Sequence, residues 1–176
     1  VPVPVVYNSG GYDRVETLHR FAGKIQIYLP DLKYMSRALA ARYSAAADYP
    51  EIATAARRER YRQTGPYVLD DNGLLQQGVL IRHLVLPGQL ENTFDVLDWV
   101  AETFRPGQVL ISLMAQYTPA GRACDFPELN QSLTVEEYQR AVDYMWGLGI
   151  EDGFVQELEA SSSLFSPNFD GSGVEL

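Results

Sequence analysis

Apolar and polar positions alternate in blocks along the chain, and the longest apolar block lies near its centre. Residues 79–86 read Val-Leu-Ile-Arg-His-Leu-Val-Leu between Gly78 and Pro87, and six of these eight residues are aliphatic. A continuous apolar run of this length predicts a strand that is buried on both faces, as in a parallel sheet. Shorter apolar runs predict further strands at residues 3–7, 24–29, 109–115 and 153–158.

Helical patterns separate these strands. Apolar residues at three- and four-residue spacing predict helices at residues 13–22, 36–46, 50–63, 92–104 and 135–148. Thr134 and Glu137 have the spacing of a capping box at the start of the last helix. Residues 67–77 predict a hairpin that turns at Asn72-Gly73. Strands that alternate with helices are typical of βα units, so the sequence predicts an α/β fold on a parallel sheet.

The composition argues against several classes of function. A formal net charge of −9 argues against a nucleic-acid-binding surface, which would carry a basic patch. Because no apolar run is long enough for a membrane span and no signal-peptide pattern is present, we expect no membrane partner. The single cysteine, Cys124, excludes an internal disulfide framework and fits a reducing, cytoplasmic location. His19 and His83 lack the spacing of a zinc site.

The length of 176 residues suits one domain. We expect this domain at residues 1–160, followed by a polar tail at residues 161–176 that is rich in serine and glycine. The chain opens at Val1 rather than at a methionine and enters a strand almost at once. This start is interpreted as a cut through a larger protein.

Two polar residues, Arg82 and His83, lie in the middle of the central strand and point to opposite faces, because side chains alternate along a strand. A buried arginine is costly unless an anion meets it. That anion is either a structural carboxylate of the chain or the carboxylate or phosphate of a ligand. His83 is expected to be a core histidine with satisfied hydrogen bonds.

Other polar side chains gather where the predicted strands end. In parallel α/β folds, ligands bind at the carboxyl ends of the strands. Asp31 and Lys33 are two residues apart, so they either share a face of one site or form a solvated loop ion pair. The segment Asn8-Ser9-Gly10-Gly11 either approaches a ribose or phosphate or is only a βα turn. Gln116 and Tyr117 follow the fourth predicted strand.

The predicted helix at residues 50–63 contains the run Arg57-Arg58-Glu59-Arg60-Tyr61-Arg62. A charge run of this kind usually marks a solvated helix face. Its alternative interpretation is a surface that docks an acidic partner.

Five segments stand in order at the predicted strand ends: residues 7–12 (YNSGGY), 27–34 (IYLPDLKY), 81–88 (IRHLVLPG), 112–117 (SLMAQY) and 153–158 (GFVQEL). Together they resemble the radical S-adenosylmethionine (radical SAM) proteins related to pyruvate formate-lyase activating enzyme. The resemblance covers most of the chain, to about Val174. It implies a partial (β/α)6 TIM-like barrel with parallel strands and outer helices.

The resemblance also implies an activity and its cofactors. In this family a [4Fe-4S] cluster cleaves S-adenosylmethionine, and the resulting 5′-deoxyadenosyl radical abstracts hydrogen from a substrate. In the activating enzymes that substrate is a glycine of a partner enzyme, a glycyl radical enzyme. The implied partners are therefore S-adenosylmethionine, a protein or small-molecule substrate, and a reductant such as flavodoxin or ferredoxin.

By position, the resemblance assigns cofactor-binding residues to this chain. Asn8, Ser9 and Gly10 match the strand-end segment beside the cofactor. Asp31 and Lys33 match an Asp-x-Lys pair, with Asp31 at a cation site, and Arg82 matches an arginine that faces the cofactor. Gln116 and Tyr117 fall at the next strand end, where the activating enzymes have a histidine near the ribose in place of Tyr117. The first strand also lacks the Asp-Thr-Asn-Gly of the activating enzymes, which favours the related branch over a true activating enzyme.

Two features of the family are missing from the chain. It contains neither the CxxxCxxC motif that holds the cluster nor the Gly-Gly-Glu segment that meets the methionyl amine. Without three thiolates no open-coordinate iron can bind S-adenosylmethionine, so this polypeptide alone is predicted to be catalytically inactive. It is interpreted as the C-terminal half of a radical SAM enzyme, an oxidoreductase. A half-barrel would expose an apolar strand edge, which we expect a second copy or the serine-rich tail to shield.

Two further functions remain open at this point. The chain could be a stand-alone, non-catalytic α/β ligand-binding module that uses the same strand ends without redox chemistry. It could also be half of a lyase or aldolase barrel in which Lys33 is the nucleophile.

Overall fold

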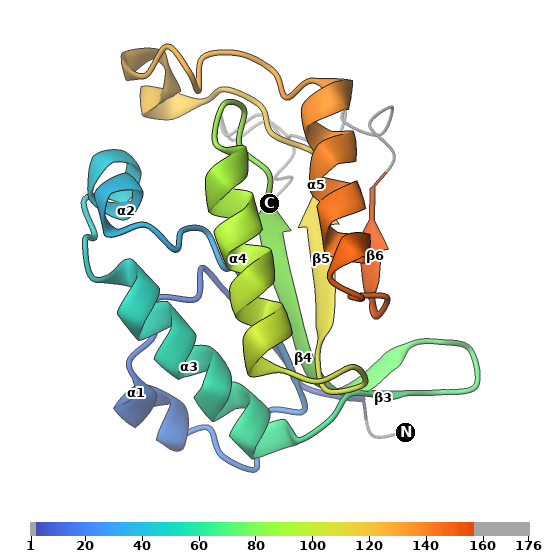
Figure 1. The fold of residues 1–176 in the computed structure, drawn as a ribbon. Helices are drawn as coiled ribbons and strands as arrows, with labels where there is room; N and C mark the ends of the chain where they lie inside the picture. The colour runs from blue at the N-terminus through green and yellow to red at the C-terminus, as the bar shows by residue number, and fades with distance from the viewer. Residues whose placement is uncertain (1–2, 157–176) are drawn as a thin grey trace, which may run out of the picture.

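The computed structural model describes residues 3–156. Its centre is a six-stranded sheet, in which five parallel strands follow the order β1-β2-β4-β5-β6 and β3 pairs antiparallel with β4 (Figure 1). The strands are β1 (Val6–Ser9), β2 (Ile27–Pro30), β3 (Val68–Leu69), β4 (Leu75–Leu84), β5 (Leu110–Met114) and β6 (Gly153–Val155). The predicted α/β fold with parallel strands is confirmed. The described strands form an open sheet and not a closed barrel.

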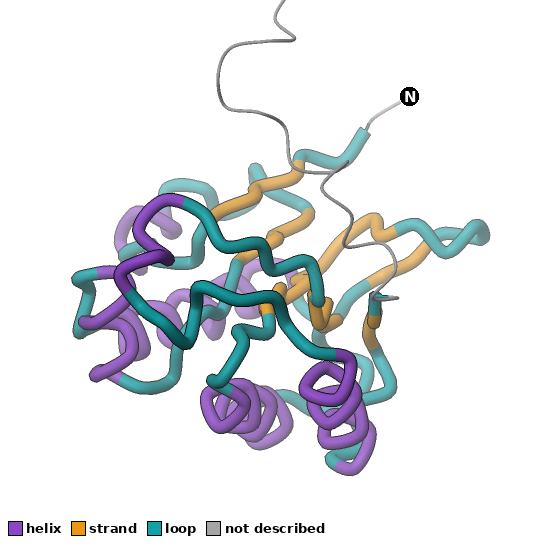
Figure 2. Tube along the Cα trace, turned by 90° about the horizontal axis from the view of Figure 1, so that it is seen from above, coloured by secondary structure: helices purple, strands orange, loops and turns teal. Residues whose placement is uncertain are grey.

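The helices connect successive parallel strands and gather on one side of the sheet (Figures 1 and 2). They are α1 (Val15–His19), α2 (Arg37–Ser44), α3 (Tyr49–Thr64), α4 (Leu90–Thr103) and α5 (Val135–Gly147), with a short 3₁₀ helix, η1 (Gly121–Asp125). All five predicted helices are present, with shifted ends. The arrangement, with parallel strands and helices outside them, agrees with the predicted fold class. None of the helices within residues 3–156 is long and apolar enough to cross a membrane.

The two faces of the sheet differ in burial. Along β4, Val79, Ile81 and His83 are completely buried beneath the helices. The alternate residues, such as Leu80 and Arg82, point to the opposite face and are only partly buried. We call this second side the open face. The prediction that the central strand is buried on both faces is therefore wrong, because the helices within residues 3–156 cover one face only.

The hairpin between α3 and β4 confirms the predicted turn. Gly73 has a φ of 76°, which a glycine adopts without strain, and the Asp70 carboxylate accepts hydrogen bonds from the backbone N–H groups of Asn72 and Leu74, each at 2.9 Å. β4 begins earlier than predicted and runs through Gly78. A Cβ at Gly78 would lie 2.7 Å from the Cα of Tyr67, so a glycine allows the hairpin to fold this closely against the strand.

A capping box fixes the start of α5. The Thr134 side chain accepts a hydrogen bond from the Glu137 backbone N–H while the Glu137 carboxylate accepts one from the Thr134 N–H, so the predicted capping box is confirmed. Glu137 also accepts a hydrogen bond from the Gly88 N–H at 2.8 Å. The cap of α5 therefore holds the loop that follows β4.

The two ends of the predicted domain differ from the prediction in what the structure describes. The first strand begins at Val6 rather than residue 3, and Val3, Val5 and Val6 are exposed, as expected for an apolar strand edge. At the other end, β6 ends at Val155. The last residues of the predicted strand at 153–158 and the whole tail at 161–176 lie outside the described residues.

Candidate functional site

Four of the predicted site residues meet in one pocket of about 260 Å³ at the carboxyl ends of the parallel strands. They are Asp31, Lys33, Arg82 and Gln116. The remaining lining residues are Tyr34, Leu84, Leu86 and Met114. Strand alternation brings them together: Arg82 lies beside Ser112 and Leu84 beside Met114 in the parallel register of β4 and β5, all on the open face.

Arg82 forms an ion pair across this pocket with Asp31. Its Nη2 atom lies 2.5 Å from Asp31 Oδ1, and Lys33 Nζ lies 3.7 Å from the other carboxylate oxygen. Of the two partners considered for Arg82, the structure therefore contains the carboxylate of the chain. The Arg82 Nε atom is buried and has no hydrogen-bond partner among the described residues.

The exposure of these side chains differs from the prediction. The Arg82 side chain is 28% exposed and that of Asp31 20%. Arg82 was expected inside a dry strand, but it lies on the open face. Lys33 is 48% exposed and paired with Asp31. A nucleophilic lysine is normally activated by desolvation or by a neighbouring cation, so this environment gives no support to an aldolase-like role.

The backbone that carries Asp31 and Lys33 is held by side chains from elements far away in the sequence. The Asn92 amide at the start of α4 donates to the carbonyl oxygen of Lys33 at 2.9 Å and accepts from the N–H of Met35 at 3.0 Å. The Leu32 N–H donates to the Arg82 carbonyl oxygen at 2.8 Å. The loop after β2 is thus fixed before any ligand binds, which preorganises the two charged side chains.

His83 supports the same loop from the helix-covered face. Its Nδ1 lies 2.6 Å from the Leu32 carbonyl oxygen and its Nε2 lies 3.0 Å from Thr93 Oγ1. Since a carbonyl oxygen only accepts, Nδ1 carries the proton and Nε2 accepts from the threonine hydroxyl. Complete burial lowers the pKa of the His83 imidazole to about 4. The expectation of a core histidine with satisfied hydrogen bonds is confirmed.

The first strand end is only partly directed at the open face. Asn8 and Gly10 are exposed, and a Cβ at Gly10 would meet nothing within 4 Å. Ser9 points to the helix-covered face, where its hydroxyl donates to Asp13 at 2.9 Å and accepts from Arg60 at 3.2 Å. The Ser9 side chain therefore stabilises the turn after β1 and does not line the pocket.

Gln116 and Tyr117 diverge after β5. Gln116 lines the pocket, and its amide oxygen accepts a hydrogen bond from the Gln156 side chain at 2.9 Å. The Tyr117 hydroxyl instead donates to the Leu129 carbonyl oxygen at 2.7 Å, and Tyr117 is not among the lining residues.

The buried Tyr138 hydroxyl donates to the Leu113 carbonyl oxygen and accepts from the Gln156 N–H, both at 2.8 Å. It therefore positions Gln156 beside Gln116.

The charged run on α3 is the largest disagreement with the sequence-based prediction. Arg57 and Arg60 are completely buried between α3 and the sheet, and Glu59 is 7% exposed. Arg60 is neutralised by an ion pair with Asp13. Arg58 and Arg62 of the same run are exposed, so the prediction of a solvated face is wrong for Arg57, Glu59 and Arg60 only. The small residues Ala53 and Ala56, on the same side of α3, leave room for the two buried arginine side chains beneath the helix.

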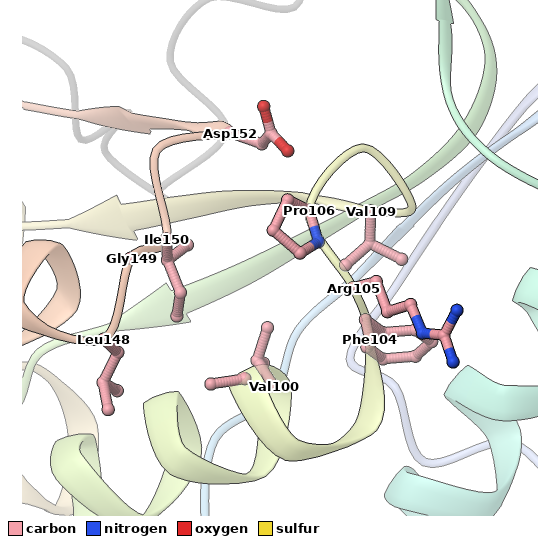
Figure 3. Close-up of a pocket in the computed structure, with 10 residues that line it drawn as sticks. Val100, Phe104, Arg105, Pro106, Val109, Leu148, Gly149, Ile150 and Asp152 are labelled. Carbon is pink, nitrogen blue, oxygen red and sulfur yellow. The ribbon is translucent and has the colours of Figure 1, made fainter.

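A second pocket lies at the opposite edge of the sheet, where β5 and β6 begin (Figure 3). Its volume is about 60 Å³, and its wall is largely apolar. The Asp152 carboxylate at its rim already accepts hydrogen bonds from the Gly107 N–H and from the Tyr67 hydroxyl. This pocket is smaller and contains none of the predicted site residues, so the pocket around Arg82 and Asp31 is the better candidate site.

The chain is similar in fold to a solved structure and similar in sequence to an uncharacterized protein. The chain has the fold of a domain of a pyruvate-formate lyase-activating enzyme from Bacteroides vulgatus, with a TM-score of 0.58 over 86% of this chain and 80% of that one. The two share 14% sequence identity, so the similarity shows the fold alone. An uncharacterized protein of Methanocaldococcus jannaschii is 30% identical over 144 residues. No family model matches the chain.

The lengths of the chain and of this relative differ. The aligned region covers 80% of the chain but 37% of the Methanocaldococcus jannaschii protein, so the chain spans well under half of that relative.

Within residues 3–156 no group of three histidine, cysteine or acidic side chains is placed to hold a metal ion. Cys124 is exposed on η1. A cluster that needs several thiolates therefore has no ligand set in the described part of the chain.

Proposed function

We propose that this chain forms the S-adenosylmethionine-facing part of a radical SAM enzyme related to pyruvate formate-lyase activating enzyme. The observation that carries the proposal is the meeting of Asp31, Lys33, Arg82 and Gln116 in one pocket at the carboxyl edge of a parallel sheet. The sequence resemblance assigned these four residues to the cofactor, and the chain shares the fold of an activating-enzyme domain.

The chemistry of the pocket fits S-adenosylmethionine. Lys33 and the guanidinium of Arg82 suit a carboxylate, whereas the Asp31 carboxylate suits an ammonium or a sulfonium group. Leu84, Leu86 and Met114 form an apolar wall of the kind that contacts a nucleoside base. When bound, this cofactor supplies a 5′-deoxyadenosyl radical for hydrogen abstraction. The residues of this chain would bind and orient it.

The iron–sulfur cluster does not fit this chain. The sequence holds one cysteine, and a [4Fe-4S] cluster that binds S-adenosylmethionine needs three thiolates. We therefore propose that the cluster is held by residues outside this chain, and that the chain alone is inactive. In the complete enzyme the substrate would be a glycine of a partner protein or a small molecule, with flavodoxin or ferredoxin as the reductant. The domain at residues 1–160 would form the cofactor-flanking half of the barrel.

The proposal is tested first by binding. Titration calorimetry of the chain with S-adenosylmethionine should give a measurable affinity, and Arg82→Met should weaken it about tenfold or more, since a charge-assisted hydrogen bond contributes roughly 1.5–3 kcal/mol. The matched control is Arg105→Met at the opposite edge of the sheet, which should leave the affinity unchanged. If the wild-type chain does not bind, or if both variants bind equally tightly, the site assignment is wrong.

The second test concerns catalysis. The longer protein that contains this chain would be reconstituted with iron and sulfide and reduced in the presence of S-adenosylmethionine. Formation of 5′-deoxyadenosine would support the radical SAM assignment. Binding of S-adenosylmethionine without any 5′-deoxyadenosine would instead favour the alternative, a non-catalytic α/β ligand-binding module, which the missing cluster ligands of this chain also favour.

A further inference from the structure

A buried tyrosine joins the two strand-end loops beside the pocket. Tyr49 is the first residue of α3 and is 3% exposed. Its hydroxyl oxygen lies 3.0 Å from the backbone nitrogen of Lys33, 3.1 Å from the Gly10 carbonyl oxygen and 3.0 Å from that of Asp31. The hydroxyl therefore accepts from the Lys33 N–H and offers its own proton to the two carbonyl groups. One side-chain atom connects the loop after β1 with the loop after β2.

The ring of Tyr49 is itself held between two aromatic side chains. It is stacked on Tyr12, with ring centroids 5.7 Å apart, and meets Tyr34 edge-on at 5.6 Å. Tyr34 lines the pocket. Tyr49 thus contacts the site both through the backbone of Asp31 and Lys33 and through a wall residue.

A buried guanidinium lies behind this tyrosine. Arg57 is completely buried, and its Nη1 donates to the Ala53 carbonyl oxygen at 2.5 Å. Its Nε and Nη2 atoms have no hydrogen-bond partner among the described residues, and no carboxylate pairs with it there. Burial lowers the pKa of the Arg57 guanidinium to about 10, while the neighbouring Tyr49 hydroxyl favours the charged form.

The space around Arg57 is filled by the backbone of the same two loops. A Cβ at Gly11 would lie 2.4 Å from Arg57 Nη2 and 2.1 Å from the Asp31 carbonyl oxygen. The guanidinium is therefore packed directly behind the turn after β1. A charge without a carboxylate partner is costly to bury, and its contacts here are with the groups that shape the site.

We propose that Tyr49, supported by Arg57, is a positioning residue that fixes Asp31 and Lys33 at the edge of the pocket. The proposal rests on the proposed function only for the identity of the ligand. The hydroxyl of Tyr49 sets the distance between the two loops, and the guanidinium of Arg57 packs behind the turn after β1. Neither side chain lines the pocket.

The first experiment needs no ligand. Native-state amide exchange at Lys33 would be measured in the wild type, Tyr49→Phe, Arg57→Met and the control Tyr28→Phe. Tyr28 is equally buried and its hydroxyl donates to Gln63 at 2.6 Å, away from the pocket. We expect the Lys33 amide to exchange about fivefold to tenfold faster in Tyr49→Phe, and to a smaller extent faster in Arg57→Met, after correction for global stability, since one hydrogen bond is lost. Tyr28→Phe should change global stability only.

A spectroscopic measurement separates positioning from a general structural role. The ¹³C chemical shift of the Asp31 side-chain carboxylate would be compared at pH 7 in the same four proteins. Tyr49→Phe should change this chemical shift, whereas Tyr28→Phe should not. If the Asp31 chemical shift and the corrected Lys33 exchange rate are the same in Tyr49→Phe as in Tyr28→Phe, the positioning role is refuted.

Binding of S-adenosylmethionine distinguishes this inference from the proposed function. If the wild type binds, Tyr49→Phe should bind about tenfold more weakly and Tyr28→Phe as tightly as the wild type. Equal affinity in Tyr49→Phe and the wild type would overturn the positioning role. If the wild type does not bind, the proposed ligand is wrong, and the exchange and chemical-shift results still decide whether Tyr49 positions Asp31 and Lys33.

Discussion

The Nδ1 atom of His83 donates a hydrogen bond to the carbonyl oxygen of Leu32 at 2.6 Å. This contact joins the central strand β4 to the loop that carries Asp31 and Lys33. Leu32 lies between these two residues, so an imidazole on the helix-covered face helps to fix charged side chains on the open face. A residue of the buried core thereby holds the backbone of a loop that lines the pocket.

The burial of His83 predicts a pH dependence of stability. Its pKa falls from 6.5 to about 4 in the folded protein. Between these values the unfolded chain binds a proton at this residue and the folded chain does not, so stability is complete above about pH 6.5 and falls as the pH drops toward 4. We expect the free energy of unfolding to decrease by about 2 kcal/mol between pH 7 and pH 5 from this residue. Urea denaturation at both pH values measures it.

The control for this prediction is His83→Gln, which keeps polar atoms but does not titrate. This variant should be less stable at pH 7 and should lose most of the slope between pH 7 and pH 5. The pKa of Glu59 is lowered to about 2, chiefly by a hydrogen bond from Arg62. Its contribution to stability is therefore constant above about pH 4.5 and is lost only below that pH, outside the range that is compared. An unchanged slope in His83→Gln would mean that the imidazole is already protonated or exposed in the folded state.

The ion pair between Arg82 and Asp31 predicts energetic coupling. A double-mutant cycle with Asp31→Asn and Arg82→Met should give a coupling free energy of about 1–2 kcal/mol, between the values of exposed and fully buried pairs, because both side chains are partly exposed. Thermal or urea denaturation of the four proteins measures this quantity. A coupling of zero would mean that water, rather than Asp31, solvates Arg82.

The ion pair between the buried Arg60 and Asp13 should contribute more to the free energy of unfolding than the pair between Arg82 and Asp31. Asp13→Asn leaves a completely buried guanidinium without its counter-charge, which should cost about 3–5 kcal/mol. The matched control is Asp125→Asn, which breaks the exposed pair with Arg122 and should cost less than about 1 kcal/mol. Similar losses in the two variants would contradict the burial of Arg60.

Two adjacent glycines should tolerate substitution very differently. Gly11→Ala places a Cβ against the Asp31 carbonyl oxygen and Arg57 in a backbone with a φ of 80°, so it should destabilise the protein by about 3 kcal/mol or more. Gly10→Ala meets nothing within 4 Å and should change stability by less than about 0.5 kcal/mol. Urea denaturation compares them. Because the family resemblance implies that Gly10 lies beside the cofactor, Gly10→Ala should still weaken binding of S-adenosylmethionine if that assignment is right.

The order of elements could be predicted from the sequence, because it depends on patterns between neighbouring residues. Apolar runs, helical spacing, the Asn72-Gly73 turn and the Thr134–Glu137 capping box are local, and each has its counterpart in the structure. The pocket residues Asp31 and Arg82 could also be predicted, since the carboxyl ends of parallel strands share one edge.

Burial could not be predicted in the same way, because it depends on which distant elements pack together. The sequence gives Arg57 and Arg60 the pattern of a solvated helix face, yet packing of α3 on the sheet buries both. The family resemblance implies that Ser9 lies near a ligand, whereas the tertiary structure turns its hydroxyl toward Asp13. No sequence signal identified Tyr49, since its partners Gly10 and Lys33 come to it only through the pairing of β1 with β2.

By itself, then, the sequence determined the class of fold and the edge of the sheet where polar groups collect, because strand and helix periods are local properties. Only the tertiary structure decided which face of the sheet is covered and which charges are buried. It also decided which side chains hold the Asp31 loop, because those contacts join residues that are distant along the chain.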